Sequence, residues 1–180
     1  MKAFKLLALT SCFLLATGSG VAQRDYSKSE GLLQYVDPYI GSGYHGHVFV
    51  GTSVPYGMVQ LGPSNIHKGW DWCSGYHYSD SILIGFSHTH LSGTGCTDLG
   101  DILIMPLNEI RTPRGNQDDI RDGYASRYSH DNEIARPEYY SLLLDRYNIK
   151  AELTATDRVG FHRYTSVSYT HLRAHETSAH

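Results

Sequence analysis

Short apolar runs separated by polar turns dominate this chain, and no segment keeps a helical period over three turns. The clearest segment is 139–164, where strand-length runs alternate with polar turns. Within it, Ala151, Leu153 and Ala155 recur with a period of two, which places their side chains on one face of a strand. The pattern predicts a meander of antiparallel strands over the runs 139–144, 151–156 and 160–164.

Three further apolar runs, bounded by Gly, Pro and Ser, predict strands earlier in the chain at 58–61, 82–86 and 102–105. Residues 108–132 are polar and rich in Gly, Asp and Arg, which predicts a long surface loop. Many short strands with frequent turn signals are typical of a β-sandwich. We therefore expect an all-β fold, an antiparallel β-sandwich, in a single domain.

The amino-acid composition limits the classes of function that the chain can have. The chain has 180 residues, with 15 Lys+Arg against 18 Asp+Glu, so its net charge of -3 argues against phosphate-driven nucleic-acid binding. The counts of 18 Gly and 14 Tyr favour turn-rich β structure with polar-tipped aromatic side chains, as sugar-facing surfaces carry. The only long apolar run is N-terminal, so no internal membrane span is expected.

The first 22 residues have the order of an export signal. Lys2 and Lys5 precede an apolar run at 6–16, and small residues follow before Gln23. We predict a signal peptide at 1–22 and a periplasmic or secreted mature protein. Lipoprotein processing is the second interpretation, because Cys12 lies inside the apolar run rather than after it.

The last fifteen residues differ in character from the segment before them. Residues 166–180 lack a clean period and hold three of the eleven histidines. Within them, the stretch VSYTHLRAHETS resembles translated adapter sequence found at the ends of unrelated gene fragments. We predict that 166–180 is a disordered, non-native tail and that the folded domain spans 23–165.

A glycine-rich loop and two histidine pairs are candidate ligand contacts. The loop 41–47 (GSGYHGH) indicates either a backbone that approaches something closely or a plain turn. His45 with His47, and His88 with His90, would each face one side of a strand, as zinc ligands can. Because histidine also serves as a donor to sugar hydroxyls and as a core residue, a zinc protein remains an alternative.

The segment 70–78 (WDWCSGYHY) holds both tryptophans of the chain among polar residues. An indole can stack on the CH face of a pyranose ring while neighbouring polar groups bind its hydroxyls. Trp70 and Trp72 are therefore candidate sugar-binding residues, and the alternative is an aromatic cluster in the core.

Two other pairs leave alternatives open. Asp98 and Asp101 could form an acid-base pair, although capping of turns explains their spacing better. Cys73 and Cys96, the cysteines that remain after the predicted cleavage, either pair as a disulfide in an oxidising compartment or stay separate thiols.

Several motifs in fixed order, from about residue 35 to residue 165, closely resemble the start of glycoside hydrolase family 92. They are YVDPYIG at 35–41, HGH at 45–47, VPYGMVQL at 54–61, the segment 70–80, GFSHTHLSGTGC at 85–96 and DLGDIL at 98–103. Members of this family are exported, calcium-dependent, inverting exo-α-mannosidases. In them an N-terminal β-sandwich precedes a large (α/α)6 barrel, and the active site lies between the two.

The resemblance implies different roles for the β-sandwich and the barrel. The family's general acid, general base and calcium ligands come mainly from the barrel, so it implies no catalytic residue and no metal ligand here, and an inactive chain when alone. The sandwich would contribute Trp70, Trp72, His45 and His47 to substrate binding. The implied partners are a mannose-containing glycan, α-1,2-linked among the candidates, and the missing barrel of the same chain. The alternative is a freestanding, non-catalytic carbohydrate-binding module.

Overall fold

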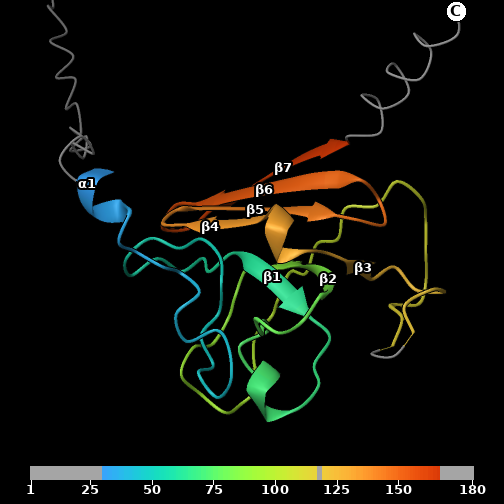
Figure 1. Cartoon of the computed structure of the whole chain (residues 1–180), viewed down its shortest axis with the longest axis horizontal. Coiled ribbons are helices and arrows are strands. Elements are labelled where there is room, and N and C mark those ends of the chain that lie inside the picture. Colours follow the sequence, from blue (N-terminus) through green and yellow to red (C-terminus); the bar gives the residue numbers. More distant parts are fainter. Residues whose placement is uncertain (1–29, 117–118, 167–180) are drawn as a thin grey trace, which may run out of the picture.

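The computed structural model describes residues 30–116 and 119–166, and it contains two antiparallel sheets stacked face to face (Figure 1). The three-stranded sheet has the order β1 (Gly62–Asn65), β2 (Ile82–Ser87) and β3 (Ser126–Arg127). The four-stranded sheet has the order β4 (Glu133–Arg136), β5 (Tyr139–Leu144), β6 (Ile149–Ala155) and β7 (Gly160–Ser166). The all-β sandwich expected from the sequence is confirmed.

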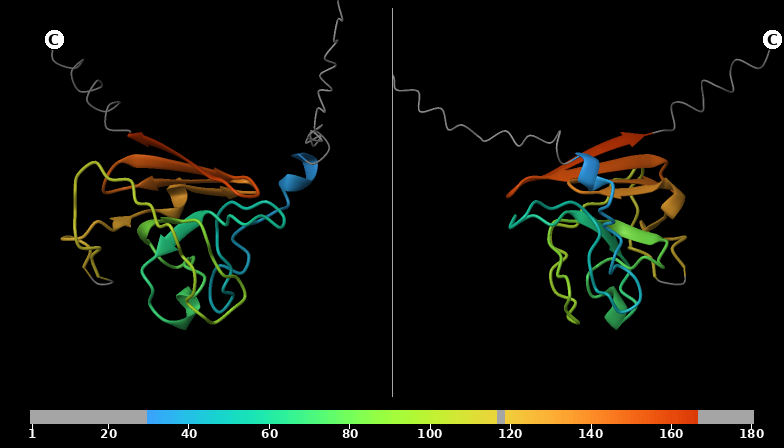
Figure 2. Two further views of the ribbon diagram at one scale, coloured as in Figure 1. Left: turned by 180° about the vertical axis from the view of Figure 1, so that it is seen from behind. Right: turned by 60° about the vertical axis from the view of Figure 1, so that its left-hand side comes forward.

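Helical structure in the described residues is limited to single turns. These are α1 (Glu30–Leu33) and the 3-10 turns η2 (Trp70–Trp72) and η3 (His130–Asn132). Within the same part of the chain, no helix is long and apolar enough to span a bilayer. The green turn η2 lies on the side of the three-stranded sheet that faces away from the four-stranded sheet (Figure 2).

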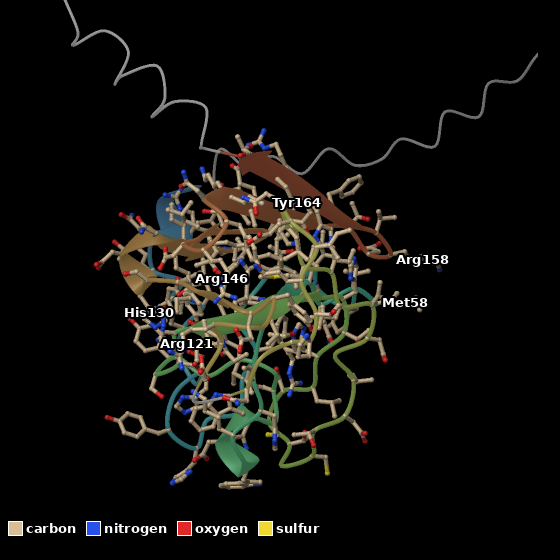
Figure 3. The ribbon with its side chains drawn as sticks, turned by 90° about the vertical axis from the view of Figure 1, so that its right-hand side faces the viewer. Met58, Arg121, His130, Arg146, Arg158 and Tyr164 are labelled. Carbon is tan, nitrogen blue, oxygen red and sulfur yellow. The ribbon has the colours of Figure 1, made fainter. Side chains whose placement is uncertain are left out.

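The predicted meander over 139–164 is confirmed as β5, β6 and β7, paired in sequence order. Burial along β6 alternates: Ile149, Ala151, Leu153 and Ala155 face the interior. The turn between β6 and β7 lies against the loop before β1, where the Met58 N–H donates to the Asp157 carbonyl at 2.7 Å. Figure 3 shows Met58 beside Arg158 at this end of the sandwich.

The main core lies between the two sheets. Phe86 of β2 and Tyr140 of β5 meet edge to face with ring centroids 6.4 Å apart, so one aromatic contact joins the two layers. Around it, β5 and β6 supply most of the aliphatic side chains. The buried members are Val50, Val59, Leu61, Tyr76, Leu83, Phe86, Tyr128, Tyr140, Leu142, Leu144, Tyr147, Ile149, Ala151, Leu153 and Ala155.

A smaller cluster covers the opposite face of the three-stranded sheet. Ile82 and Ile84 of β2 pack there with Ile66, Ile120 and Ala125. All six residues of β2 are therefore buried, which explains why this strand is a continuous apolar run rather than an alternating one. The prediction of a strand at 82–86 is confirmed.

Two predicted strands are wrong. Runs 58–61 and 102–105 form only isolated bridges, Leu61 with Thr52 and Ile104 with Phe86. Ile102, Leu103 and Ile104 are exposed, so these apolar side chains are not strand core. A strand that the sequence did not predict, β1, follows directly after the first run. Its first residue, Gly62, passes so close to Val50 that an added Cβ would lie 2.2 Å from the Val50 carbonyl oxygen.

The predicted segment boundaries are only partly described. Ser166, assigned to the tail, is the last residue of β7 and pairs with Ile149, and β3 lies inside the predicted loop 108–132. The expected signal peptide at 1–22 and the remaining tail residues 167–180 lie outside the described residues. Both stay predictions from the sequence.

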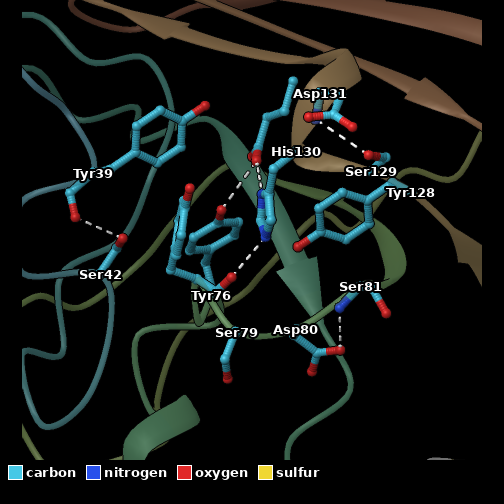
Figure 4. Close-up of polar contacts among 12 residues, drawn as sticks. Tyr39, Ser42, Tyr76, Ser79, Asp80, Ser81, Tyr128, Ser129, His130 and Asp131 are labelled. Carbon is cyan, nitrogen blue, oxygen red and sulfur yellow. Dashed lines mark hydrogen bonds and ion pairs between the residues drawn. The ribbon is translucent and has the colours of Figure 1, made fainter.

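A buried carboxylate at the start of β4 joins the four-stranded sheet to the segment after η2, and Figure 4 labels two of its partners, Tyr76 and His130. Glu133 of β4 accepts hydrogen bonds from the hydroxyls of Tyr140, at 2.6 Å, and Tyr76, at 3.2 Å. His130 Nδ1 lies 2.5 Å from the same carboxylate, and His130 Nε2 donates to the Tyr78 carbonyl at 2.6 Å. The Glu133 side chain is fully buried, so its charge depends on these donors.

We expect the fold to lose stability steeply above about pH 10. Burial, with the nearby charge of Glu133, raises the pKa of Tyr128 and of Tyr140, and burial likewise raises the pKa of Tyr76. These phenols stay neutral in the folded state and ionise first in the unfolded chain, where the tyrosine pKa is about 10. The contribution of these tyrosines to the free energy of unfolding is therefore fully present below about pH 10. Above pH 10 it is lost, by about 1.4 kcal/mol per pH unit for each tyrosine.

Urea unfolding midpoints measured between pH 7 and pH 11.5 check this expectation. Tyr128→Phe should flatten the alkaline slope, whereas Tyr44→Phe, at a tyrosine that is 90% exposed, should leave it unchanged. A midpoint that stays constant between pH 9 and pH 11.5 would contradict the prediction.

Candidate functional site

The glycine-rich loop 41–47 and the turn η2 lie against each other, although they are distant in sequence. Asp71 of η2 joins them: His45 Nδ1 donates to its Oδ1 at 2.6 Å, and His47 Nε2 approaches the same oxygen at 3.4 Å. The structure thus brings together three of the four residues predicted to bind sugar, His45, His47 and Trp70. Asp71, which connects them, was not among the predicted residues.

Asp71 is held as an anion in this cluster. The hydrogen bond from His45, with a smaller contribution from His47, outweighs partial desolvation and lowers the pKa of Asp71 below its usual range. The His45 side chain is exposed and that of His47 is buried, so one imidazole faces solvent while the other contacts the carboxylate from the protein interior. The exposed side of the cluster offers an acceptor and an imidazole to hydroxyl groups.

Trp70 projects from η2 beside this cluster and is 58% exposed. Its indole ring meets the His47 imidazole edge to face, with centroids 4.2 Å apart and an interplanar angle of 86°. The backbone at Gly95 reaches the indole edge, where an added Cβ would lie 2.2 Å from Nε1. An aromatic ring that is oriented by neighbours yet exposed is suited to stacking on an apolar ligand face.

Trp72 has different surroundings. Its Nε1–H donates to Asp80 Oδ2 at 2.8 Å, and its ring stacks on His77 with centroids 4.3 Å apart. Asp80 is buried and also pairs with Lys68 at 2.9 Å. Trp72 lines a small cavity of about 110 Å³ together with Asp98. These contacts indicate that Trp72 supports the turn more than it presents an open face.

The loop 41–47 depends on residues without side-chain bulk. A Cβ on Gly46 would lie 2.0 Å from the Gly41 carbonyl oxygen, so the loop closes on its own backbone. The close contact is thus within the loop, and the Gly46 N–H donates to the Gly43 carbonyl at 3.1 Å, which agrees with the alternative interpretation of a turn. Tyr44 and His47 both have positive φ, 51° and 55°, a conformation that costs energy in residues other than glycine. Such strain is often found at binding sites.

Replacing Gly46 with alanine should open this loop. Since the new Cβ meets backbone rather than a flexible side chain, we expect the free energy of unfolding to fall by about 1–3 kcal/mol. Urea unfolding measures the change. Gly31→Ala is the matched control, because a Cβ there meets nothing within 4 Å, and equal losses in the two variants would contradict the explanation.

The second histidine pair does not act as a pair. Strand β2 ends at Ser87, so His88 and His90 do not share a strand face. His90 is buried: its Nδ1 donates to the Gln60 carbonyl at 2.8 Å, and its Nε2 lies 2.9 Å from Ser87 Oγ. Burial lowers the pKa of His90 to about 4. His88 turns instead toward His162 of β7, and the expectation that His88 and His90 face one side is wrong.

The aspartate and cysteine pairs singled out in the sequence do not form functional pairs either. Asp101 bonds Thr89, through its backbone N–H at 3.0 Å and its carboxylate at 3.3 Å, which agrees with the capping interpretation. Cys73 and Cys96 are both free thiols, and Cys73 donates to the Thr94 carbonyl. In the described ranges, no three or more histidine, cysteine, aspartate or glutamate side chains are arranged to hold a metal ion.

Comparisons with known proteins agree with the motifs. The family model described as the glycosyl hydrolase family 92 N-terminal domain matches residues 35–172. A protein from Arthroderma benhamiae, named as an uncharacterized secreted glycosidase, is 31% identical over 74% of this chain and 17% of its own length.

Solved structures give the same result. A family 92 α-mannosidase from Bacteroides thetaiotaomicron, solved with mannoimidazole, is 44% identical with a TM-score of 0.72. An inverting family 92 mannosidase from the same organism is 26% identical with a TM-score of 0.55. Each match covers 74% of this chain and 18% of the solved chain, so the chain spans less than a fifth of these relatives. The chain belongs to glycoside hydrolase family 92, and its described residues form the N-terminal β-sandwich of that family.

Proposed function

We propose that this chain is the N-terminal part of an exported, calcium-dependent, inverting exo-α-mannosidase that hydrolyses mannosyl linkages of glycans, with α-1,2 linkages among the candidates. The observation that carries the proposal is the cluster of His45, His47, Trp70 and Asp71 in a domain of this family. The relative solved with mannoimidazole is an α-mannosidase, which supports the substrate class.

The cluster would form one wall of a sugar site. The exposed indole of Trp70 covers the apolar CH face of a mannose ring, while Asp71 accepts from a hydroxyl and His45 exchanges hydrogen bonds with another. An inverting mechanism also needs a carboxylic acid and a carboxylate about 6.5–9.5 Å apart. We assign both to the barrel, and we assign no catalytic residue to this chain.

Calcium does not fit the donors of this cluster. Calcium takes six to eight oxygen ligands, whereas two imidazoles and a single carboxylate meet here. We therefore assign the calcium ligands to the rest of the protein. Export to the periplasm or the medium rests on the signal peptide predicted at 1–22, and the relative from Arthroderma benhamiae is also named as secreted.

The test compares the complete protein with the 180-residue chain. With calcium present, the complete protein should release β-mannose from α-1,2-mannobiose, and a chelator should abolish this release. The 180-residue chain should release none. Release of the α-anomer would contradict the inverting mechanism, and activity of the 180-residue chain would contradict the assignment of the catalytic groups.

A freestanding carbohydrate-binding module is the second candidate, because the exposed Trp70 and the neighbouring polar groups could bind a sugar without any catalytic residue. Sequencing the locus beyond codon 165 separates the two. A continuing frame that encodes several hundred helix-rich residues supports the enzyme, and a native stop codon supports the module.

A further inference from the structure

Two histidines, one just after β2 and one in the edge strand β7, meet at a distance from the Trp70 cluster. His88 directly follows β2, and His162 lies in β7. Their Nε2 atoms are 3.1 Å apart, and both residues are partly buried. A Cβ on Gly160 would lie 2.9 Å from the His88 ring, so the glycine at the start of β7 leaves room for this approach.

The outer nitrogen of each ring is already engaged. His88 Nδ1 lies 2.9 Å from the Ile102 carbonyl, which can only accept, so Nδ1 carries the proton and Nε2 presents a lone pair. His162 Nδ1 lies 2.7 Å from the Tyr164 hydroxyl, which can either donate or accept. Histidines that bind metals hold their second nitrogen in this way, on a carbonyl or another polar group.

The two tautomers of His162 define two uses of the pair. When the Tyr164 hydroxyl donates to Nδ1, His162 Nε2–H donates to His88 and the pair is a hydrogen bond. When the hydroxyl accepts, the proton sits on Nδ1, and both Nε2 lone pairs are free for one ion. Neither state requires a net loss of protons from the pair.

The geometry points to a site for a divalent transition-metal ion of the zinc, nickel and copper class, held by His88 Nε2 and His162 Nε2 and completed by water. An ion about 2.1 Å from both nitrogens, given their 3.1 Å separation, subtends roughly 95°, which suits tetrahedral or octahedral coordination. The ring centroids are 4.9 Å apart. Two rings that met end to end through their Nε2 atoms would have centroids farther apart than this, because the radius of each ring would add to the 3.1 Å between the nitrogens. The rings therefore converge at an angle rather than meeting end to end.

Two further observations fit this ion class. Imidazole donors suit zinc, nickel and copper and not calcium, so this site is distinct from any calcium site. The contact of His162 Nδ1 with the Tyr164 hydroxyl also fixes the orientation of the ring, as a polar partner does for metal-binding histidines. A bound ion would connect β7 to the segment that leaves β2, and it would stabilise the folded state by mass action.

The test is a zinc titration by calorimetry on untagged protein. The parent for every measurement carries His171→Gln, His175→Gln and His180→Gln, so that histidines of the last fifteen residues do not contribute to zinc binding. The parent should bind one zinc ion, and saturation should raise Tm by at least about 5 °C. His88→Gln and His162→Gln should each weaken binding tenfold or more and remove the Tm shift. His67→Gln, at an exposed histidine outside the pair, should bind as the parent does.

Several results would overturn the site. A folded parent without saturable zinc binding overturns it, and so does an equal loss of affinity in His67→Gln. Loss in His45→Gln with binding retained in His162→Gln would move the ion to the Asp71 cluster. If the His88 and His162 variants do not fold, copper electron paramagnetic resonance on the parent with His45→Gln decides: coupling to two imidazole nitrogens supports the site, and coupling to none or one refutes it.

Discussion

Glu133→Ala should lower the free energy of unfolding by about 3–5 kcal/mol, one of the two largest effects we expect from a single substitution. The carboxylate is fully buried and accepts from Tyr76, Tyr140 and His130. His130 bridges this carboxylate and the Tyr78 carbonyl, which its Nε2 contacts at 2.6 Å. Removing Glu133 therefore leaves two buried hydroxyls and the His130 ring without their partner.

A matched pair of variants isolates this effect. Glu133→Gln keeps one acceptor oxygen and the side-chain volume, so its loss should be less than that of Glu133→Ala. Glu109→Ala, which removes an exposed carboxylate paired with Arg111, should leave the urea midpoint unchanged. If Glu133→Ala unfolds at the same urea concentration as Glu109→Ala, the buried cluster does not stabilise the fold.

The sequence predicted the four-stranded sheet better than the three-stranded one, for a physical reason. In β6, one face is buried and the other is not, so the alternation of side chains is visible in the sequence. β1 (GPSN) has no such pattern, because its role is to fit tightly against Val50 and Ser87 rather than to supply apolar surface. Conversely, Ile102 to Ile104 are apolar but exposed.

Residues of the candidate site could be predicted only where each lies in a recognisable local motif. The Gly-rich loop and the aromatic segment pointed to His45, His47 and Trp70, and a charged residue between two tryptophans was the available signal for Asp71. The contact of His88 with His162 depends on how β7 aligns with β6 and how the chain leaves β2. Such a contact between distant segments leaves no local pattern, and so the sequence paired His88 with His90.

Trp70→Ala in the complete protein should lower kcat/KM about 10- to 100-fold and change stability little. Trp70 is 58% exposed, so the loss of its indole removes little core packing. One aromatic contact contributes about 0.5–1.5 kcal/mol beyond area burial, and the lost burial of the sugar face adds to it. Water would then compete for the hydroxyl groups that Asp71 and His45 bind.

Trp72→Ala should instead act mainly on stability, with an expected loss of about 2–4 kcal/mol in the free energy of unfolding. It removes the stack on His77 and leaves buried Asp80 without one of its donors. Trp72→Phe keeps an aromatic ring but loses the Nε1–H bond, so it should fall between Trp72→Ala and the parent. Urea midpoints and kcat/KM per folded molecule, measured on all three variants, separate the roles. Unchanged kcat/KM in folded Trp70→Ala would remove Trp70 from the sugar site, and a normal urea midpoint in Trp72→Ala would remove its structural role.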